Sequence, residues 1–172
     1  MSKPADKKIL VVDDEDDIRQ FLELALREAG FNVIIATDGF EAMEQVEKEN
    51  PDLISLDLVM PKKSGAKFYR DLSKSKKYNK IPVLIVTGHA RDELGRADLK
   101  ELTLSGPGIY LEKPISPPKY VAAVKSLLGL DATDEEKVLA EQVNLQSELK
   151  NIIDAADPET LKQLKKLING KK

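Results

Sequence analysis

The fold is decided by KILVVDD, residues 8–14, where a short aliphatic run ends in two aspartates. Such a run, without polar alternation, is typical of a strand that is buried on both faces of a parallel sheet. Comparable short runs recur up to about Leu130. We therefore predict strands at residues 8–12, 32–36, 53–56, 82–86 and 109–111.

Segments with a helical period separate these strands. The first helix carries a single apolar stripe that Gly30 can end. The stripe consists of Ile18, Phe21, Leu22, Ala25, Leu26 and Ala29. Further helices are predicted at residues 41–49, 66–73, 91–104 and 118–128, the last with Ser116 as its N-cap. Strands that alternate with helices in this way build an α/β fold around a parallel sheet.

The chain changes character after Gly129. Residues 131–172 hold no strand candidate and are rich in Leu, Glu, Lys and Gln. We therefore expect two parts, a domain at residues 1–130 and a C-terminal helical extension at residues 131–172.

The extension is predicted to be a helical hairpin. A capping box of Thr133 and Glu136 begins its first helix, and Asp157 with Pro158 begins the second. Apolar side chains form a stripe along the first helix at Val138, Leu145, Leu149, Ile152 and Ala156, widened by Leu139 and Ile153 and interrupted by Gln142. Such a stripe most often packs within its own chain, although a wide apolar face at a chain end could equally bind a second copy.

Composition excludes several classes of function. The 172 residues carry a formal net charge of −3, so no basic excess is available to grip nucleic acid. The chain has no cysteine and a single histidine, His89, so disulfides and zinc sites lack ligands. Its aliphatic runs are far shorter than the ~20 residues that cross a bilayer, and its start lacks the apolar core of a signal peptide. We expect a cytoplasmic protein that binds neither nucleic acid nor membrane.

Polar side chains follow four of the predicted strands, where the carboxyl ends of parallel strands meet at one rim of the sheet. They are Asp13 and Asp14, Asp57, Thr87 and Gly88, and Lys113 and Pro114. Three carboxylates within about 4 Å of one another would repel by about 4 kcal/mol per pair, so a cation must offset their charge. An oxygen-only donor set suits Mg²⁺.

Charge counting indicates that this site could act as a switch. Three carboxylates, one Mg²⁺ and the Lys113 ammonium sum to about zero. Conversion of one carboxylate to an acyl phosphate makes the sum about −1, and the new oxygens can recruit Lys113 and the Thr87 hydroxyl. The lack of a side chain at Gly88 would let the backbone approach those oxygens.

The chain resembles the response-regulator receiver domains of two-component signalling in four segments, VVDDEDD (residues 11–17), DLVMPKKSG (57–65), IVTG (85–88) and YLEKP (110–114). The resemblance covers about residues 7–130 and implies a flavodoxin-like, doubly wound sheet of strand order 2-1-3-4-5. It implies Asp57 as the phosphoacceptor, with Mg²⁺ held directly by Asp14 and Asp57, through water by Asp13 and by the backbone carbonyl of Val59. It further implies Thr87 as the switch hydroxyl, Lys113 as the phosphate counter-ion before a cis Pro114, and Tyr110 as an aromatic switch.

By the same resemblance, a sensor histidine kinase or a phosphotransfer protein would supply the phosphoryl group, and a downstream protein of unknown identity would receive the signal. The chain would then be no enzyme beyond its own Mg²⁺-dependent phosphorylation and dephosphorylation. One departure stands out, because the segment between Thr87 and Gly106 is roughly one helical turn longer than the common pattern. The usual partner surface of the family is therefore not carried over.

Two alternatives stay open. The C-terminal helices could form a homodimer, as a stalk within a longer signalling architecture. Asp57 could instead be the nucleophile of an aspartate-dependent phosphatase. Such enzymes carry a DxD pattern in which the second Asp is the general acid. In this chain the position of the second Asp holds Val59.

Overall fold

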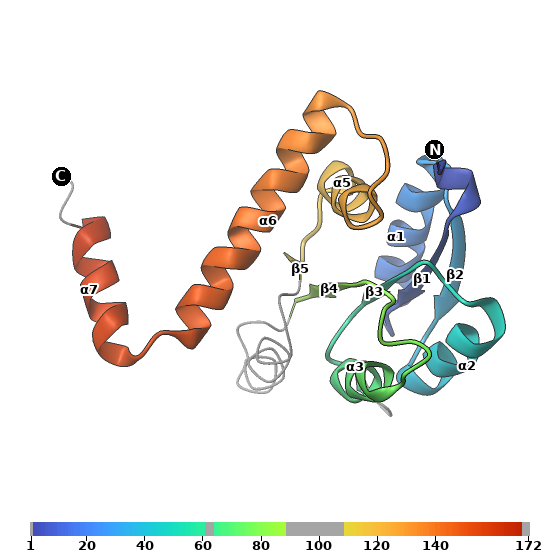
Figure 1. Cartoon of the computed structure of the whole chain (residues 1–172), viewed down its shortest axis with the longest axis horizontal. Helices are drawn as coiled ribbons and strands as arrows, with labels where there is room; N and C mark the ends of the chain where they lie inside the picture. The colour runs from blue at the N-terminus through green and yellow to red at the C-terminus, as the bar shows by residue number, and fades with distance from the viewer. Residues whose placement is uncertain (1, 61–63, 89–108, 170–172) are drawn as a thin grey trace.

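Five parallel strands form one sheet in the order β2-β1-β3-β4-β5 (Figure 1). The structure, a computed structural model, describes residues 2–60, 64–88 and 109–169. Its strands are β1 (Lys8–Val12), β2 (Asn32–Ala36), β3 (Leu53–Leu56), β4 (Val83–Thr87) and β5 (Ile109–Glu112). The predicted flavodoxin-like topology is confirmed, and both β4 and β5 end one residue later than predicted.

Helices cover both faces of this sheet. A 3-10 turn, η1 (Pro4–Asp6), precedes β1, and the described helices are α1 (Asp16–Glu28), α2 (Gly39–Glu49), α3 (Gly65–Lys74), α5 (Pro117–Leu127), α6 (Asp134–Ala155) and α7 (Pro158–Asn169). None of these helices has the length and apolar character that a membrane span requires. The helix predicted at residues 91–104 and the longer segment after Thr87 lie outside the described residues, as do His89 and Pro61.

Two apolar clusters, one on each face of the sheet, make the core. Successive strand residues point to opposite faces, so Leu10 of β1 packs with α2 and α3, whereas Ile9 and Val11 pack with α1 and α5. The four residues Ile9 to Val12 are at most 1% exposed, as expected for a strand covered on both sides. The aliphatic run at residues 9–12 therefore contributes to the core on both faces of the sheet.

N-cap residues explain why α2 and α3 begin slightly earlier than their apolar stripes indicated. Asp38 caps α2 by accepting hydrogen bonds from the backbone N–H groups of Phe40 and Glu41. Ser64 caps α3 in the same way. Ser116 does occupy the N-cap position of α5, but its side chain makes no capping hydrogen bond. Phe21 belongs to the predicted apolar stripe of α1, but it lies at the border of that stripe and is 41% exposed.

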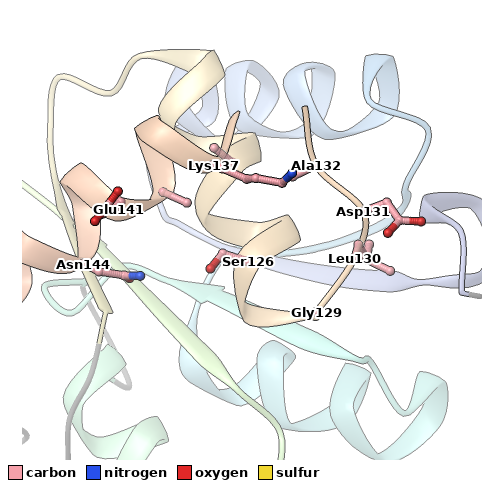
Figure 2. A pocket seen from close by; sticks show the side chains of 10 residues that line it. Ser126, Gly129, Leu130, Asp131, Ala132, Lys137, Glu141 and Asn144 are labelled. Atoms are coloured by element: carbon pink, nitrogen blue, oxygen red, sulfur yellow. The ribbon is translucent and has the colours of Figure 1, made fainter. Parts of the chain in front are cut away.

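The two predicted C-terminal helices are present, and α6 packs on the rest of the chain through α5 and β5. The predicted capping box of Thr133 and Glu136 begins α6, and Glu136 also accepts a hydrogen bond of 2.6 Å from the Lys125 ammonium of α5. Figure 2 shows Ser126 of α5 beside Glu141 and Asn144 of α6, around a pocket of about 370 Å³.

A serine joins α6 to the outermost strand. Ser147 is 4% exposed, and its Oγ accepts a hydrogen bond of 3.1 Å from the backbone N–H of Tyr110 in β5. The same Oγ lies 3.3 Å from the Tyr110 carbonyl oxygen and 2.8 Å from that of Val143. Since β5 is the last strand of the sheet, α6 covers its outer edge.

The apolar stripe of α6 is not the face that packs. Ala140, Val143 and Ser147 are buried against the domain. Val138, Leu145, Leu149, Ile152 and Ile153 are instead exposed. Of the two readings left open for this stripe, packing within the chain does not hold for these five residues.

Candidate functional site

Three predicted acids meet at the carboxyl ends of β1 and β3. Asp13 and Asp14 follow β1, and Asp57 follows β3, which lies next to β1 in the sheet. Each contributes one carboxylate oxygen to a group in which all oxygens lie within 4.8 Å of one another. Asp13 and Asp57 are 1% exposed, and Asp14 is half-buried. The sheet therefore concentrates negative charge at one point of its rim.

Lys113 reaches this group from the end of β5. Its Nζ lies 2.8 Å from Asp13 Oδ2 and 3.4 Å from Asp57 Oδ2. It also lies 3.0 Å from Oε1 of Glu15. The sequence reasoning had missed Glu15 as a partner, although its place two residues after Asp13 in the same acidic run was an available signal. The ammonium thus supplies part of the positive charge that the clustered acids require.

Burial and ion pairing shift the pKa values of Asp13 and Lys113 in opposite directions. Burial raises the pKa of Asp13 above its usual value, and the hydrogen bonds from Lys113 and from the Glu15 N–H offset only part of this rise. Burial alone would lower the pKa of Lys113, but its hydrogen bond to Asp13 and the charges of Asp57 and Asp13 raise that pKa well above its usual range. Lys113 is therefore a permanent cation at neutral pH.

Backbone contacts hold the two buried acids in place. The Glu15 N–H donates to Asp13 Oδ1 at 3.0 Å, and the Val59 N–H donates to Asp57 Oδ1 at 3.3 Å. A Cβ atom on Gly65 would lie 1.8 Å from the backbone oxygen of Asp57, so only glycine fits there. Gly65, the first residue of α3, thus packs directly against the backbone of Asp57, the residue predicted to accept the phosphoryl group.

The donor set at the rim fits a divalent cation of the Mg²⁺ type. All candidate ligand atoms of Asp13, Asp14 and Asp57 are carboxylate oxygens. Three carboxylates against the single ammonium of Lys113 leave a charge of about −2, which one divalent ion neutralises. Asp13 Oδ2 is buried, and apart from its ion pair with Lys113 it makes no hydrogen bond of regular geometry. Its lone pairs therefore remain available to a cation or to a water bound to one.

The remaining predicted residues border the same rim. Thr87 ends β4 in register with Glu112, the residue before Lys113. Gly88 lines an open pocket of about 390 Å³ together with Glu112, Lys113 and Pro114. A Cβ atom at Gly88 would meet Lys113 carbons at 3.6 Å, an ordinary contact, so packing within the chain does not itself require glycine there. The peptide bond between Lys113 and Pro114 is cis, as the resemblance implied.

Tyr110 lies on β5, which β4 separates from the acid-bearing strand β3. It is 8% exposed and belongs to the apolar cluster that also contains Ile85 of β4, its neighbour in the strand register. Its backbone is bonded to Ser147 of α6. Tyr110 therefore connects the strand that ends at Thr87 with the C-terminal extension.

Comparison with known proteins agrees with this geometry. The family model of the response regulator receiver domain matches residues 9–125. The chain is 43% identical over 123 residues to the alkaline phosphatase synthesis transcriptional regulatory protein PhoP of Bacillus subtilis, a match that covers 71% of this chain and 48% of PhoP. It is similarly 34% identical over 122 residues to the phosphate regulon transcriptional regulatory protein PhoB of Escherichia coli. The chain thus spans about half the length of the curated relatives it matches.

Solved structures share the same fold. The chemotaxis protein CheY4 of Vibrio cholerae matches with a TM-score of 0.62 and 30% identity, covering 71% of this chain and 98% of CheY4. The receiver domain of the sensor histidine kinase PA1611 from Pseudomonas aeruginosa, solved with a magnesium ion in its active site cleft, matches with a TM-score of 0.64 and 24% identity over 72% of this chain and 98% of that domain. With its sheet order, its acidic rim and a family match over most of its length, the chain belongs to the response regulator receiver domain family of two-component systems.

Proposed function

We propose that Asp57 accepts a phosphoryl group in a reaction that needs Mg²⁺, and that the chain then signals through contact with another protein. The observation that carries this proposal is the meeting of Asp13, Asp57 and Lys113, with the ammonium 2.8 Å and 3.4 Å from the two carboxylates. Mg²⁺, when bound, would offset charge on the carboxylates and on the incoming phosphoryl oxygens. Asp13, Asp14, Asp57 and the carbonyl of Val59 are the groups we assign to hold it.

The chemical step follows from the position of Asp57. A carboxylate oxygen of Asp57 attacks the phosphorus of a phosphohistidine or a small phosphodonor, the bond from phosphorus to the leaving group breaks, and an acyl phosphate forms. Lys113 moves its contact from the Asp57 carboxylate to the new phosphoryl oxygens. The Thr87 hydroxyl and the backbone at Gly88 complete the contacts, and Tyr110 responds to the shift of Thr87.

An apolar hollow beside the site supports a protein as the phosphodonor. The hollow has a volume of about 310 Å³ and is lined by Asp17, Ile18 and Phe21 of α1 and by Lys113, Pro114 and Ile115. The exposed ring of Phe21 gives it an apolar rim. Apolar surface next to a reactive group is typical of a docking site for a partner. We assign it to the sensor histidine kinase or phosphotransfer protein.

Phosphorylation by acetyl phosphate tests the proposal directly. Incubation with Mg²⁺ and acetyl phosphate should add one phosphoryl mass to the intact protein, and Asp57→Asn should abolish the addition. Asp17→Asn is the matched control, because Asp17 is an exposed aspartate in the first turn of α1 and outside the acidic group. Retention of the added mass in Asp57→Asn, or its loss in the control, would contradict the assignment.

The alternative of an aspartate-dependent phosphatase has little support in the site. Val59 occupies the position of the general acid in the DxD pattern and cannot donate a proton. We propose that the chain handles only its own phosphoryl group, and steady release of phosphate from an added phosphomonoester would contradict this. The prediction that the chain avoids nucleic acid concerns only the 172 residues shown, since the matches cover 48% and 52% of the two relatives named as transcriptional regulatory proteins.

A further inference from the structure

Helix α6 has two faces with different roles. Ala140, Val143 and Ser147 are buried against α5 and β5. The opposite face carries Leu145, Leu149 and Ile152, whose exposed fractions are 53%, 58% and 58%. Figure 1 shows α7 turning away after α6, and the apolar face stays more than half exposed with α7 in place. The helix is therefore anchored on one side and uncovered on the other.

The spacing on the uncovered face is that of a coiled coil. Val138, Gln142, Leu145, Leu149 and Ile152 follow one another at intervals of four, three, four and three residues. We call these five residues the seam. This alternation repeats every seven residues, a mean interval of 3.5, which is the repeat that keeps an apolar stripe facing a second helix. The seam thus indicates a helical partner that runs along α6.

We propose that the seam binds the seam of a second copy of this chain, as a parallel pair of α6 helices. Gln142 is the polar member at a position that would face its own equivalent. A carboxamide donates and accepts hydrogen bonds, so two such side chains satisfy each other across a symmetric pair. A single polar residue at such a position is a known device for fixing register between two helices.

The charges beside the seam favour the parallel direction. Glu141 and Glu148 are exposed on one flank, whereas the other flank carries Gln146 and Ile153. In an antiparallel pair the two acidic flanks would face each other. In a parallel pair Glu141 faces Gln146 of the partner and Glu148 faces Ile153 of the partner, so no acid opposes an acid.

This pairing does not disturb the contact between α6 and its own receiver domain. Because Ala140, Val143 and Ser147 point away from the seam, each copy keeps its contact between α6 and β5. Two receiver domains would then lie on the outer sides of a central helix pair. This inference goes beyond the phosphoryl chemistry and does not depend on it.

Light scattering of the full chain tests the pairing. The wild-type chain should have the mass of a dimer, and Leu149→Glu should have the mass of a monomer with an unchanged circular dichroism spectrum, because Leu149 is exposed. Leu24→Glu is the matched control, since Leu24 of α1 is 57% exposed and lies outside the seam. A monomeric wild-type chain across a wide concentration range would overturn the proposal, and so would dissociation by Leu24→Glu to the same extent.

Cysteine pairing tests the direction, and the absence of native cysteines makes the readout clean. Under mild oxidation, Val138→Cys and Ile152→Cys should each form a disulfide with the same residue of the second copy, because both ends of the seam are in register only in a parallel pair. Lys137→Cys, exposed and outside the seam, should not. A disulfide that forms only when the Val138→Cys and Ile152→Cys chains are mixed would overturn the parallel arrangement, and equal reaction of Lys137→Cys would overturn the seam.

Discussion

Replacement of Asp13 by asparagine should remove both the repulsion within the acidic cluster and most of the stabilisation by Mg²⁺. Two carboxylates within 4.8 Å of each other repel by at least about 3.5 kcal/mol at an effective dielectric constant near 20. Burial already raises the pKa of Asp13, so its charged form is disfavoured in the folded chain. A neutral carboxamide of the same shape removes this repulsion, and Lys113 keeps its contacts with Asp57 and Glu15. Without Mg²⁺, Asp13→Asn should therefore be at least as stable as the wild type.

Mg²⁺ should stabilise the wild type much more than it stabilises Asp13→Asn. A ligand at about 100 times its dissociation constant raises the free energy of unfolding by about 2.7 kcal/mol. For a chain of this size, that corresponds to a rise in Tm of about 5 to 10 °C. Asp13→Asn should lose most of this rise because it removes one of the three clustered carboxylates.

The assay is thermal unfolding by circular dichroism at neutral pH, with and without saturating Mg²⁺. Asp17→Asn is the control and should keep the full rise in Tm. The reasoning is refuted if Asp13→Asn responds to Mg²⁺ as the wild type does, or if Mg²⁺ leaves the Tm of the wild type unchanged.

Three further predictions concern the supports of the site and of α6. Ser147→Ala removes the acceptor of the Tyr110 N–H and should lower the free energy of unfolding by about 1 to 3 kcal/mol, with faster amide hydrogen exchange in α6; unchanged exchange there would contradict the contact. Gly65→Ala should cost about 3 kcal/mol or more in urea unfolding, because its Cβ would collide with the Asp57 backbone, whereas Gly88→Ala should change little, and equal effects would be contrary evidence. Burial raises the pKa of Glu136, but the hydrogen bonds from Lys125 and Thr133 lower it further, so the folded chain favours the ionised form. The contribution of Glu136 to stability is therefore complete above its unfolded pKa of 4.5 and is lost as pH falls through the lower folded pKa. The free energy of unfolding, measured as a function of pH, should fall less toward acid in Glu136→Gln than in the wild type. Identical curves would count against the ion pair.

The strands and the acidic rim were predictable from the sequence for a simple physical reason. A strand buried on both faces must be apolar throughout, so the run from Ile9 to Val12 has no other plausible place than the centre of a sheet. Parallel strands also bring their carboxyl ends together, so Asp13 and Asp57 were placed correctly without knowledge of their contacts.

The role of α6 could not be predicted in the same way. Periodicity shows which side chains share a helix face, but it does not show what covers that face. The face of α6 that packs is made of Ala140, Val143 and Ser147, which are small and give a weak apolar signal, yet they let α6 come close to α5 and β5. The larger residues of the seam gave the stronger apolar signal, yet they lie on the exposed side of α6.

The hydroxyl of Ser147 has a consequence for the solubility of the molecule. By engaging both backbone polar groups of Tyr110 at the outer border of the sheet, it occupies the place that an intruding extended segment from another molecule would take. A bare border of this kind is a template for cross-strand stacking and, in the extreme, for amyloid growth. The C-terminal extension therefore shields the receiver from fibril-like association, and a fragment ending at Gly129 would lose that shield.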